Sequence, residues 1–236
     1  MGVPRSITIP KDCLTCSLRQ KGDFCDLPQP LMSVFNAIGH LTLYPAKATL
    51  LVEGQNPRGV YIACSGRAKL SVEARDGKTI ILKIVGDRQV LGLSAVISGG
   101  MSPITVTTIE LCQIKFVERE SFLRLIEHDS RAALECAAML GREVTTSFDD
   151  VHELLLARSS TEKLARLLLS WVSGEPRNRE LRVLTEFTHE EISQMIGSSR
   201  ETVTRLLSDM KRKDLIRFEG ATLVIPNRIA LQAITS

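Results

Sequence analysis

The sequence predicts an α+β fold with three parts: a β-roll of the jelly-roll type, one long helix and a C-terminal winged helix-turn-helix. Three observations support this prediction. Short β-branched runs are separated by glycines, an apolar stripe repeats at helical spacing, and two capped helices meet at a glycine turn. We expect a cysteine-rich head at residues 1–30, the β-roll at 31–127, the long helix at 128–157 and the winged domain at 158–236.

The composition is that of a soluble globular protein with room for two domains. Of 236 residues, 44% are hydrophobic and 24% are charged. Residues 1–10 contain no apolar run, and residues 89–109, the longest uncharged stretch, are interrupted by glycines and a proline. We therefore expect strands and a loop there, no membrane-spanning helix, and a cytoplasmic protein. Six cysteines in that compartment indicate metal binding, redox chemistry or buried thiols rather than disulfides.

The β-roll prediction rests on residues 33–120. Residues 61–64, 68–72 and 79–85 are short runs rich in β-branched or apolar side chains, and glycines follow at turn positions. The Asp76-Gly77 pair is a hairpin signal between two of these runs. Many short strands at close spacing are typical of a sandwich or a jelly roll.

The long helix is predicted by an apolar stripe that recurs at steps of three and four residues. Two interpretations of the stripe stay open: packing of the helix on its own domain, or a dimer interface of the coiled-coil type. A second helix is expected over residues 162–171. The stripe consists of Ala133, Ala137, Leu140, Val144, Phe148, Val151 and Leu155.

The sharpest local pattern lies in residues 188–225. Thr188 begins a capping box that starts one helix, and Gly197 breaks that helix. A second capping box, from Ser198 to Glu201, opens another helix. Two short helices joined by a tight glycine turn form a helix-turn-helix, and residues 217–224 then predict the hairpin of a wing.

The second helix presents polar groups suited to DNA. An arginine in the first turn of a recognition helix grips a guanine edge, a glutamate accepts from cytosine, and hydroxyls bind phosphates. The net charge of +3 at pH 7 comes entirely from residues 158–236, which also indicates a nucleic-acid partner there. The candidate DNA-binding residues are Thr188, Ser198, Ser199, Arg200, Glu201, Thr202, Thr204 and Arg205.

Residues 199–205 read SRETVTR and are followed by the wing, and this segment resembles the CRP/FNR family of bacterial transcription regulators. The resemblance extends over most of the chain. It implies a homodimer on a two-fold DNA site, with RNA polymerase as a partner. Arg200, Glu201 and Arg205 match the base-contacting positions of the family. Arg200 is the residue of the CRP branch, whose half-sites resemble TGTGA.

The same resemblance argues against a cyclic nucleotide as the signal. The CRP branch holds cyclic AMP with a glutamate in a Gly-Glu-Leu turn and with an Arg-Ser pair about ten residues later. Leu93 stands at the position of that glutamate, and Pro103 and Ile104 stand at the positions of the Arg-Ser pair. A buried phosphate needs a guanidinium partner, so we expect no cyclic nucleotide here.

The cysteines resemble those of the FNR branch, which holds an oxygen-labile 4Fe-4S cluster with four thiolates. The gap before Cys25 has eight residues where the family usually has five. Tetrahedral zinc and a plain thiol switch stay open as alternatives. We expect Cys64 and Cys136 to be inert core residues. The candidate cluster ligands are Cys13, Cys16, Cys25 and Cys112.

No enzyme signature stands out. The four histidines are scattered, and no nucleophile triad or carboxylate pair is apparent. A thiol oxidoreductase with a CxxC motif would be the enzyme alternative, but that chemistry normally needs a neighbouring βαβ pattern, which is absent. The sequence therefore predicts a DNA-binding regulator that is not an enzyme.

Overall fold

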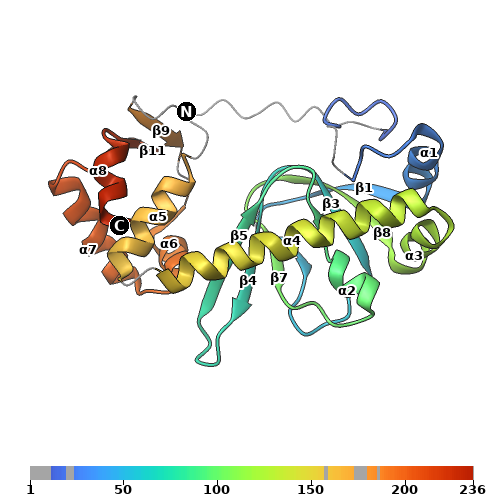
Figure 1. Cartoon of the computed structure of the whole chain (residues 1–236), viewed down its shortest axis with the longest axis horizontal. Helices are drawn as coiled ribbons and strands as arrows, with labels where there is room; N and C mark the ends of the chain where they lie inside the picture. The colour runs from blue at the N-terminus through green and yellow to red at the C-terminus, as the bar shows by residue number, and fades with distance from the viewer. Residues whose placement is uncertain (1–11, 20–23, 157–158, 173–179, 185–186, 236) are drawn as a thin grey trace. The chain divides into compact units, whose positions relative to one another are not determined.

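The computed structural model describes residues 12–19, 24–156, 159–172, 180–184 and 187–235 (Figure 1). Two compact units emerge. The first combines residues up to 72 with residues 82–146, and the second consists mainly of residues 147–236. None of the helices in the described ranges is both long enough and apolar enough to cross a lipid bilayer.

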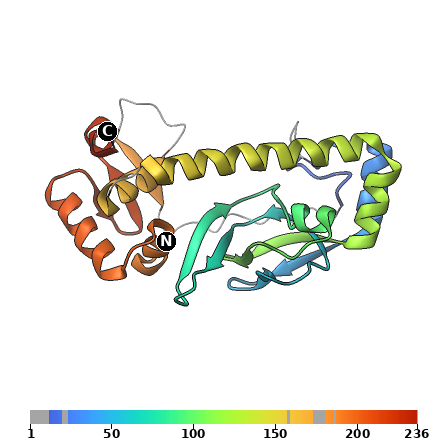
Figure 2. The same ribbon diagram turned by 60° about the horizontal axis from the view of Figure 1, so that its bottom comes forward.

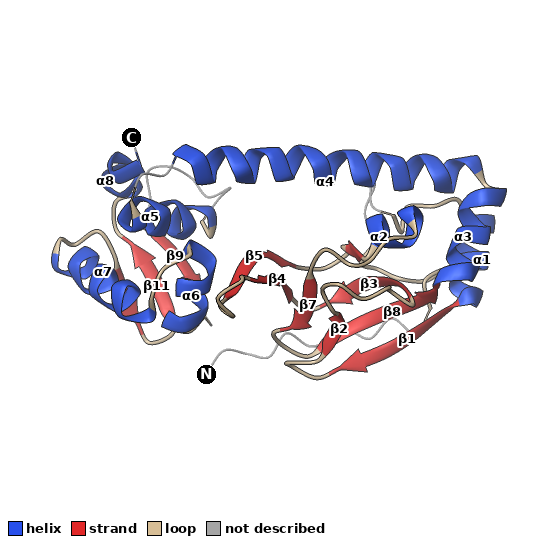
Figure 3. Cartoon of the chain, turned by 90° about the horizontal axis from the view of Figure 1, so that it is seen from below, coloured by secondary structure: helices blue, strands red, loops and turns tan. Residues whose placement is uncertain are grey.

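The first unit is a β-roll of two four-stranded antiparallel sheets, drawn in red in Figure 3. One sheet has the order β1-β8-β3-β6 and the other has the order β2-β7-β4-β5. This confirms the predicted β-roll. The strands are β1 (Gly39–Tyr44), β2 (Thr49–Leu51), β3 (Gly59–Ser65), β4 (Ala68–Glu73), β5 (Thr79–Val85), β6 (Val90–Leu91), β7 (Thr105–Thr108) and β8 (Cys112–Glu118).

The three strands expected from the apolar runs are present as β3, β4 and β5. The predicted hairpin between β4 and β5 is also present. Gly77 has a φ of 79°, and its N–H donates to the carbonyl of Ala74 at 2.8 Å. A left-handed backbone at this turn strongly favours glycine, which is why the Asp-Gly pair marked the hairpin correctly.

Three helices accompany the strands of the predicted β-roll region. Helix α1 spans Gln29–Ile38, α2 spans Leu93–Ser98 and α3 spans Arg119–His128. The expectation of only strands and a loop at residues 89–109 is therefore wrong at α2. Left-handed Gly92 and Gly99 flank this six-residue helix, which is too short to display a helical period in the sequence.

The sheet β1-β8-β3-β6 has an apolar core on each face. Its inner face meets the second sheet, where Ala63 and Ile114 pack with Leu51 and Val106. We call the opposite side the outer face, where other residues of β3 and β8 pack with α1, α3 and the first turns of α4. Because side chains alternate along a strand, residues two apart share a face. The outer-face residues of this sheet include Val60, Ile62 and Val117.

The long helix α4 (Ser130–Leu156) begins directly after α3 and is unbroken (Figure 2). Ala132 and Cys136 bury its first turns in the outer-face core, and Leu140 packs against that core. The rest of the predicted stripe is exposed: Ala133, Ala137, Val144, Phe148 and Val151. The side chain of Leu155 lies outside the described residues. Most of the stripe therefore lies away from the side of α4 that packs on the β-roll.

The second unit is a winged helix-turn-helix, as predicted. A three-stranded sheet of order β10-β11-β9 packs with its helices around a core that includes Leu164, Ile192, Val203 and Leu223. The elements are α5 (Ser160–Ser170), β9 (Leu181–Leu184), α6 (His189–Ile196), α7 (Arg200–Arg212), β10 (Arg217–Glu219), β11 (Thr222–Ile225), α8 (Arg228–Gln232) and a 3-10 turn (Ala233–Thr235).

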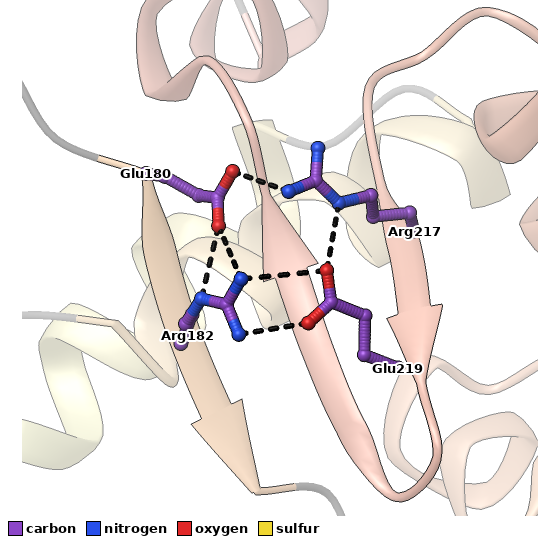
Figure 4. Close-up of polar contacts among 4 residues, drawn as sticks. All are labelled: Glu180, Arg182, Arg217 and Glu219. Atoms are coloured by element: carbon purple, nitrogen blue, oxygen red, sulfur yellow. Dashed lines mark hydrogen bonds and ion pairs between the residues drawn. The ribbon is translucent and has the colours of Figure 1, made fainter.

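Charged side chains join β10 to β9 across β11 (Figure 4). Arg182 reaches Glu219 at 2.7 Å and Glu180 at 2.8 Å, and Arg217 contacts both glutamates. Arg217 and Arg182 both pair with Val224, which is fully buried between them. Exposed ion pairs contribute little to stability, so the consequence of this network is mainly the alignment of the wing.

One of the two predicted helix starts is confirmed, and the other is displaced by one residue. The capping box at Thr188 is confirmed. The box from Ser198 to Glu201 is wrong, because Ser199 is the N-cap and accepts from the N–H of Thr202 at 3.2 Å. The N–H of Ser198 instead donates to the carbonyl of Ser193 at 2.9 Å. This hydrogen bond ends α6, and Gly197, the C-cap residue before Ser198, has a left-handed backbone.

This cap assignment predicts unequal effects of two adjacent serines. Ser199→Ala removes the N-cap of α7 and should lower the free energy of unfolding of the C-terminal unit by about 1 kcal/mol. Ser198→Ala is the matched control and should change it by less than about 0.5 kcal/mol. Urea unfolding followed by circular dichroism measures both variants. A larger loss with Ser198→Ala would contradict the assignment.

Candidate DNA interface and cysteine site

The first turns of α7 form an exposed polar surface. Arg200, Glu201, Thr204 and Arg205 line a shallow open depression together with Ser208. Four of these five residues were predicted from the sequence. Ser208 was missed, although it lies four residues after Thr204 and hence on the same side of the helix. Among the described contacts, neither Arg200 nor Arg205 has a side-chain hydrogen bond, so their guanidinium groups are available to a ligand.

The hydroxyl groups predicted to bind phosphate also organise the protein itself. Thr188 accepts from the N–H of Glu191 at 3.2 Å, and Ser199 caps α7 beside Thr202. Thr204 donates to the carbonyl of Arg200, and its oxygen lies 2.9 Å from Nδ1 of His189. These bonds fix the first turn of α7 against α6.

The carboxylate of Glu201 folds back onto the start of α7. Hydrogen bonds from its own backbone N–H and from the Ser199 hydroxyl lower the pKa of this carboxyl, and the neighbouring Arg200 adds to the effect. Glu201 is therefore ionised at neutral pH. Glu201 therefore places a negatively charged acceptor next to Arg200 in the first turn of α7.

The cysteine head lies on the outer face of the β-roll sheet. Residues 12–19 form bends and turns, and the N–H of Cys13 donates to Oδ1 of Asn36 in α1 at 3.1 Å. Phe24 is buried in the outer-face core, and Cys13 and Cys25 pack against that core. Phe24 also contacts the rings of Phe35 and Phe122. Aromatic packing thus anchors the end of the head.

A buried lysine stands beneath the head. Lys115 of β8 is only 3% exposed, and its ammonium donates to the carbonyls of Asn36 and Gly39 at 3.2 Å and 3.4 Å. The same ammonium lies 3.3 Å from Oδ1 of Asn36, which also accepts from the Cys13 N–H. Sequence reasoning missed Lys115. Its position two residues before outer-face Val117 was the available signal.

The charge of this lysine acts on two thiols, Cys13 and Cys64. Burial raises the pKa of the Cys13 thiol, Lys115 opposes that rise, and Cys16 adds to it. Burial also raises the pKa of Cys64 to about 12, and the Cys13 and Cys16 thiols contribute to that rise. Such mutual effects require proximity. The structure therefore brings Cys64, expected to be an inert core residue, close to two of the predicted ligands.

Cys112 lies elsewhere. It is 1% exposed, belongs to the inner-face core, and its thiol donates to the carbonyls of Arg67 and Glu110 at 3.2 Å and 3.4 Å. Burial raises its pKa to about 11. The structure does not bring Cys112 together with the head cysteines, because the sheet separates them. Within the described ranges, no three His, Cys, Asp or Glu side chains already stand close enough to hold a metal ion.

The positions compared with a cyclic-nucleotide site are largely apolar. Leu93 begins α2 and is 3% exposed in the outer-face core. Pro103 is exposed, and Ile104 packs against the inner-face core. None of these three side chains carries a charge or a hydrogen-bonding group for a ribose or a phosphate.

Two family models match the chain, one after the other. The cyclic nucleotide-binding domain matches residues 41–129, and the Crp-like helix-turn-helix domain matches residues 162–234. The matched segments together cover more than half of the chain. The β-roll and the winged unit of the structure fall within them.

Individual proteins are similar to this chain along most of their length. The CRP-like cAMP-activated global transcriptional regulator of Mycobacterium tuberculosis is 28% identical over 193 residues, covering 80% of this chain and 86% of the relative. The cAMP-activated global transcriptional regulator CRP of Haemophilus influenzae is 27% identical over 198 residues, covering 83% and 88%.

Solved structures share the fold. FixK2 from Bradyrhizobium japonicum aligns with a TM-score of 0.69 at 23% identity, over 84% of this chain and 98% of that one. The c-di-GMP responsive regulator CLP of Xanthomonas campestris aligns with a TM-score of 0.70 at 19% identity, over 85% and 100%. From the ordered domain matches and this architecture, the chain belongs to the CRP/FNR family of transcription regulators.

Proposed function

We propose that this chain is a sequence-specific DNA-binding regulator controlled by an oxygen- or redox-labile 4Fe-4S cluster on the cysteine head. The observation that carries the proposal is the docking of the head beside a buried cation: Cys13 and Cys25 pack on the outer-face core, and the Asn36 side chain accepts from both the Cys13 N–H and the Lys115 ammonium. Thiolates are the usual ligands of such clusters. A thiolate-ligated cluster is negatively charged, and Lys115 supplies a compensating charge.

The outer-face core connects the cysteine head to the long helix α4. Phe24 at the end of the head packs with Phe35 of α1 and Phe122 of α3, and the same core includes Ala132 and Cys136 of α4. When bound, the cluster would supply sensitivity to oxygen or to redox change. The chain's own residues would then transmit the ordering of the head to the start of α4.

Helix α4 is proposed as the homodimer interface. Its exposed stripe includes Val144, Phe148 and Val151, and the Phe148 side chain is 71% exposed. A row of exposed apolar side chains at helical spacing fits a second copy of the same helix. A dimer would place two copies of α7 on a DNA duplex with two-fold half-sites resembling TGTGA, with RNA polymerase as the partner in transcription.

Zinc or a plain thiol switch on the same fold is the second candidate, because tetrahedral zinc also takes thiolates. A thiol oxidoreductase is disfavoured by local structure. Residues 12–19 form bends and turns, so Cys13 does not open a helix whose dipole would lower its pKa. Burial raises that pKa instead.

A cyclic nucleotide is the other candidate signal, because the named relatives are cAMP-activated and a domain model of that type matches. We propose that this chain does not use it. Buried Leu93, exposed Pro103 and apolar Ile104 offer no partner for the sugar or for the phosphate.

The first prediction concerns base reading. Arg200→Ala should lose about 1–3 kcal/mol of binding free energy on the cognate site and relax the preference at one base pair per half-site, because it removes a bidentate donor. Fluorescence anisotropy on a set of single-base variants of the site measures both effects. An equal loss on every sequence would instead make Arg200 a phosphate contact.

The second prediction concerns cyclic AMP. Because no charged or hydrogen-bonding side chain stands at the three compared positions, cyclic AMP should change neither the melting temperature nor the affinity for DNA. Differential scanning fluorimetry and a DNA titration with and without the nucleotide provide the readout. A saturable shift in either quantity would contradict this assignment.

The third prediction concerns air. Anaerobically purified protein should bind its DNA site as a dimer, and exposure to air should weaken that binding by about tenfold or more, because the head loses its order. Anisotropy and sedimentation velocity, both run under nitrogen and in air, report affinity and oligomeric state. Cys16→Ser is the control and should bind equally weakly in both. Wild-type protein that is indifferent to air would contradict the proposal.

A further inference from the structure

One hydroxyl group on the exposed surface of α7 is already engaged within the protein. Thr204 is exposed in the second turn of α7 and lines the depression together with Arg200 and Arg205. Its hydroxyl donates to the carbonyl of Arg200, four residues earlier, at 2.9 Å. Nδ1 of His189, at the start of α6, lies 2.9 Å from the same hydroxyl oxygen. Two partners, one from each helix, therefore hold the Thr204 side chain.

These two bonds leave the Thr204 hydroxyl without a hydrogen for a ligand. A hydroxyl carries one hydrogen and two lone pairs, and a carbonyl oxygen can only accept. The hydrogen therefore goes to the Arg200 carbonyl, and the bond with His189 is donated by the Nδ1–H of the imidazole. The bond thus selects the tautomer of neutral His189 that carries its hydrogen on Nδ1.

The engaged hydroxyl limits what Thr204 can recognise on DNA. Phosphate oxygens only accept hydrogen bonds, and so do N7 and O6 of guanine and O4 of thymine. Donation from Thr204 to any of these atoms would break its bond to the Arg200 carbonyl. The other group on its Cβ is a methyl group. A threonine methyl makes an apolar contact with the C5-methyl of thymine, which no other base presents in the major groove.

The neighbouring hydroxyl is engaged in the same way. Ser208 donates to the carbonyl of Thr204 at 2.8 Å, so both hydroxyl hydrogens of the depression serve α7 itself. The donors that remain for a base edge are the guanidinium groups of Arg200 and Arg205. Thr204 lies between these polar groups along the helix and adds an apolar group to the same surface.

We propose that Thr204 is a specificity-determining residue that reads a thymine through its methyl group, and that His189 is the positioning residue that holds this methyl toward the base. The inference rests on the proposed function, because it needs a DNA duplex bound to α7. It assigns one thymine in each half-site to one side chain. His189 acts through the Thr204 hydroxyl and has no need to touch the DNA.

The test uses a DNA site that the full-length protein, purified anaerobically, selects from random duplexes. Each thymine of this site is replaced in turn by deoxyuridine, which lacks only the C5-methyl group, and fluorescence anisotropy gives the affinity. At one thymine per half-site the replacement should weaken binding about fourfold, the effect of one buried methyl group. A selected site without such a thymine overturns the inference. Failure to select any site overturns sequence-specific binding itself.

Two variants of Thr204 assign the sensitive thymine. Thr204→Val keeps the methyl group in the rotamer that a helix prefers and loses the hydroxyl, so it should still distinguish thymine from uracil. Thr204→Ser keeps the hydroxyl and lacks the methyl group, so it should bind both sites equally. The opposite pattern, discrimination by Thr204→Ser and none by Thr204→Val, would show that the hydroxyl is read and overturns the inference.

Two variants of His189 test the positioning role. His189→Leu removes the Nδ1–H donor and should reduce the ratio of thymine to uracil affinity by about half, whereas His189→Asn offers an amide N–H and should restore the ratio. In Thr204→Val the ratio should not depend on His189, because the hydroxyl is gone. A loss that is equal on both DNA sites would make His189 a phosphate contact and overturns its positioning role. Circular dichroism confirms that each variant is folded.

Discussion

The buried ammonium of Lys115 is the interaction on which the first unit depends. It joins the end of α1 through the Asn36 carbonyl and the start of β1 through the Gly39 carbonyl, and its charge opposes the rise that burial causes in the pKa of the Cys13 thiol. Asn36 adds a second link, because its side chain accepts from both Lys115 and the Cys13 N–H. A buried charge that loses its partners is strongly destabilising, so these parts are held as one. The same positive charge favours the deprotonated, thiolate form of nearby cysteines.

In the second unit, exposed polar and charged groups, rather than a buried charge, hold the elements in place. Thr188 and Ser199 satisfy the backbone at the starts of α6 and α7 and thereby orient the outward side chains of α7. The paired Arg182 and Arg217 align the wing, and their charges are already balanced by Glu180 and Glu219. Arg200 and Arg205 remain as the arginines of this surface without such partners among the described contacts. Under the proposed function, these two arginines, with Glu201 beside Arg200, are the charged groups that would face a base edge.

Local patterns predicted the regular elements well. Glycine-separated runs marked β3, β4 and β5, and the stripe on α4 marked a long helix whose apolar side is mostly exposed. Short or register-dependent features escaped prediction. Helix α2 is too short to show a period, and α7 starts one residue late because α6 uses Ser198 for its own end. The opposite placement of Cys64, two residues after outer-face Ile62, and of Cys112, two residues before inner-face Ile114, depends on strand register, which spacing along the chain does not encode.

The proposed function requires an all-thiolate iron site on the outer face of the β-roll. X-ray absorption at the iron edge of the anaerobically purified wild-type protein tests this most directly. We expect iron to be bound by sulfur only, with short iron–iron scattering, and we expect both signals to be lost after exposure to air. A protein that contains zinc without iron, or iron bound by nitrogen and oxygen, would contradict it.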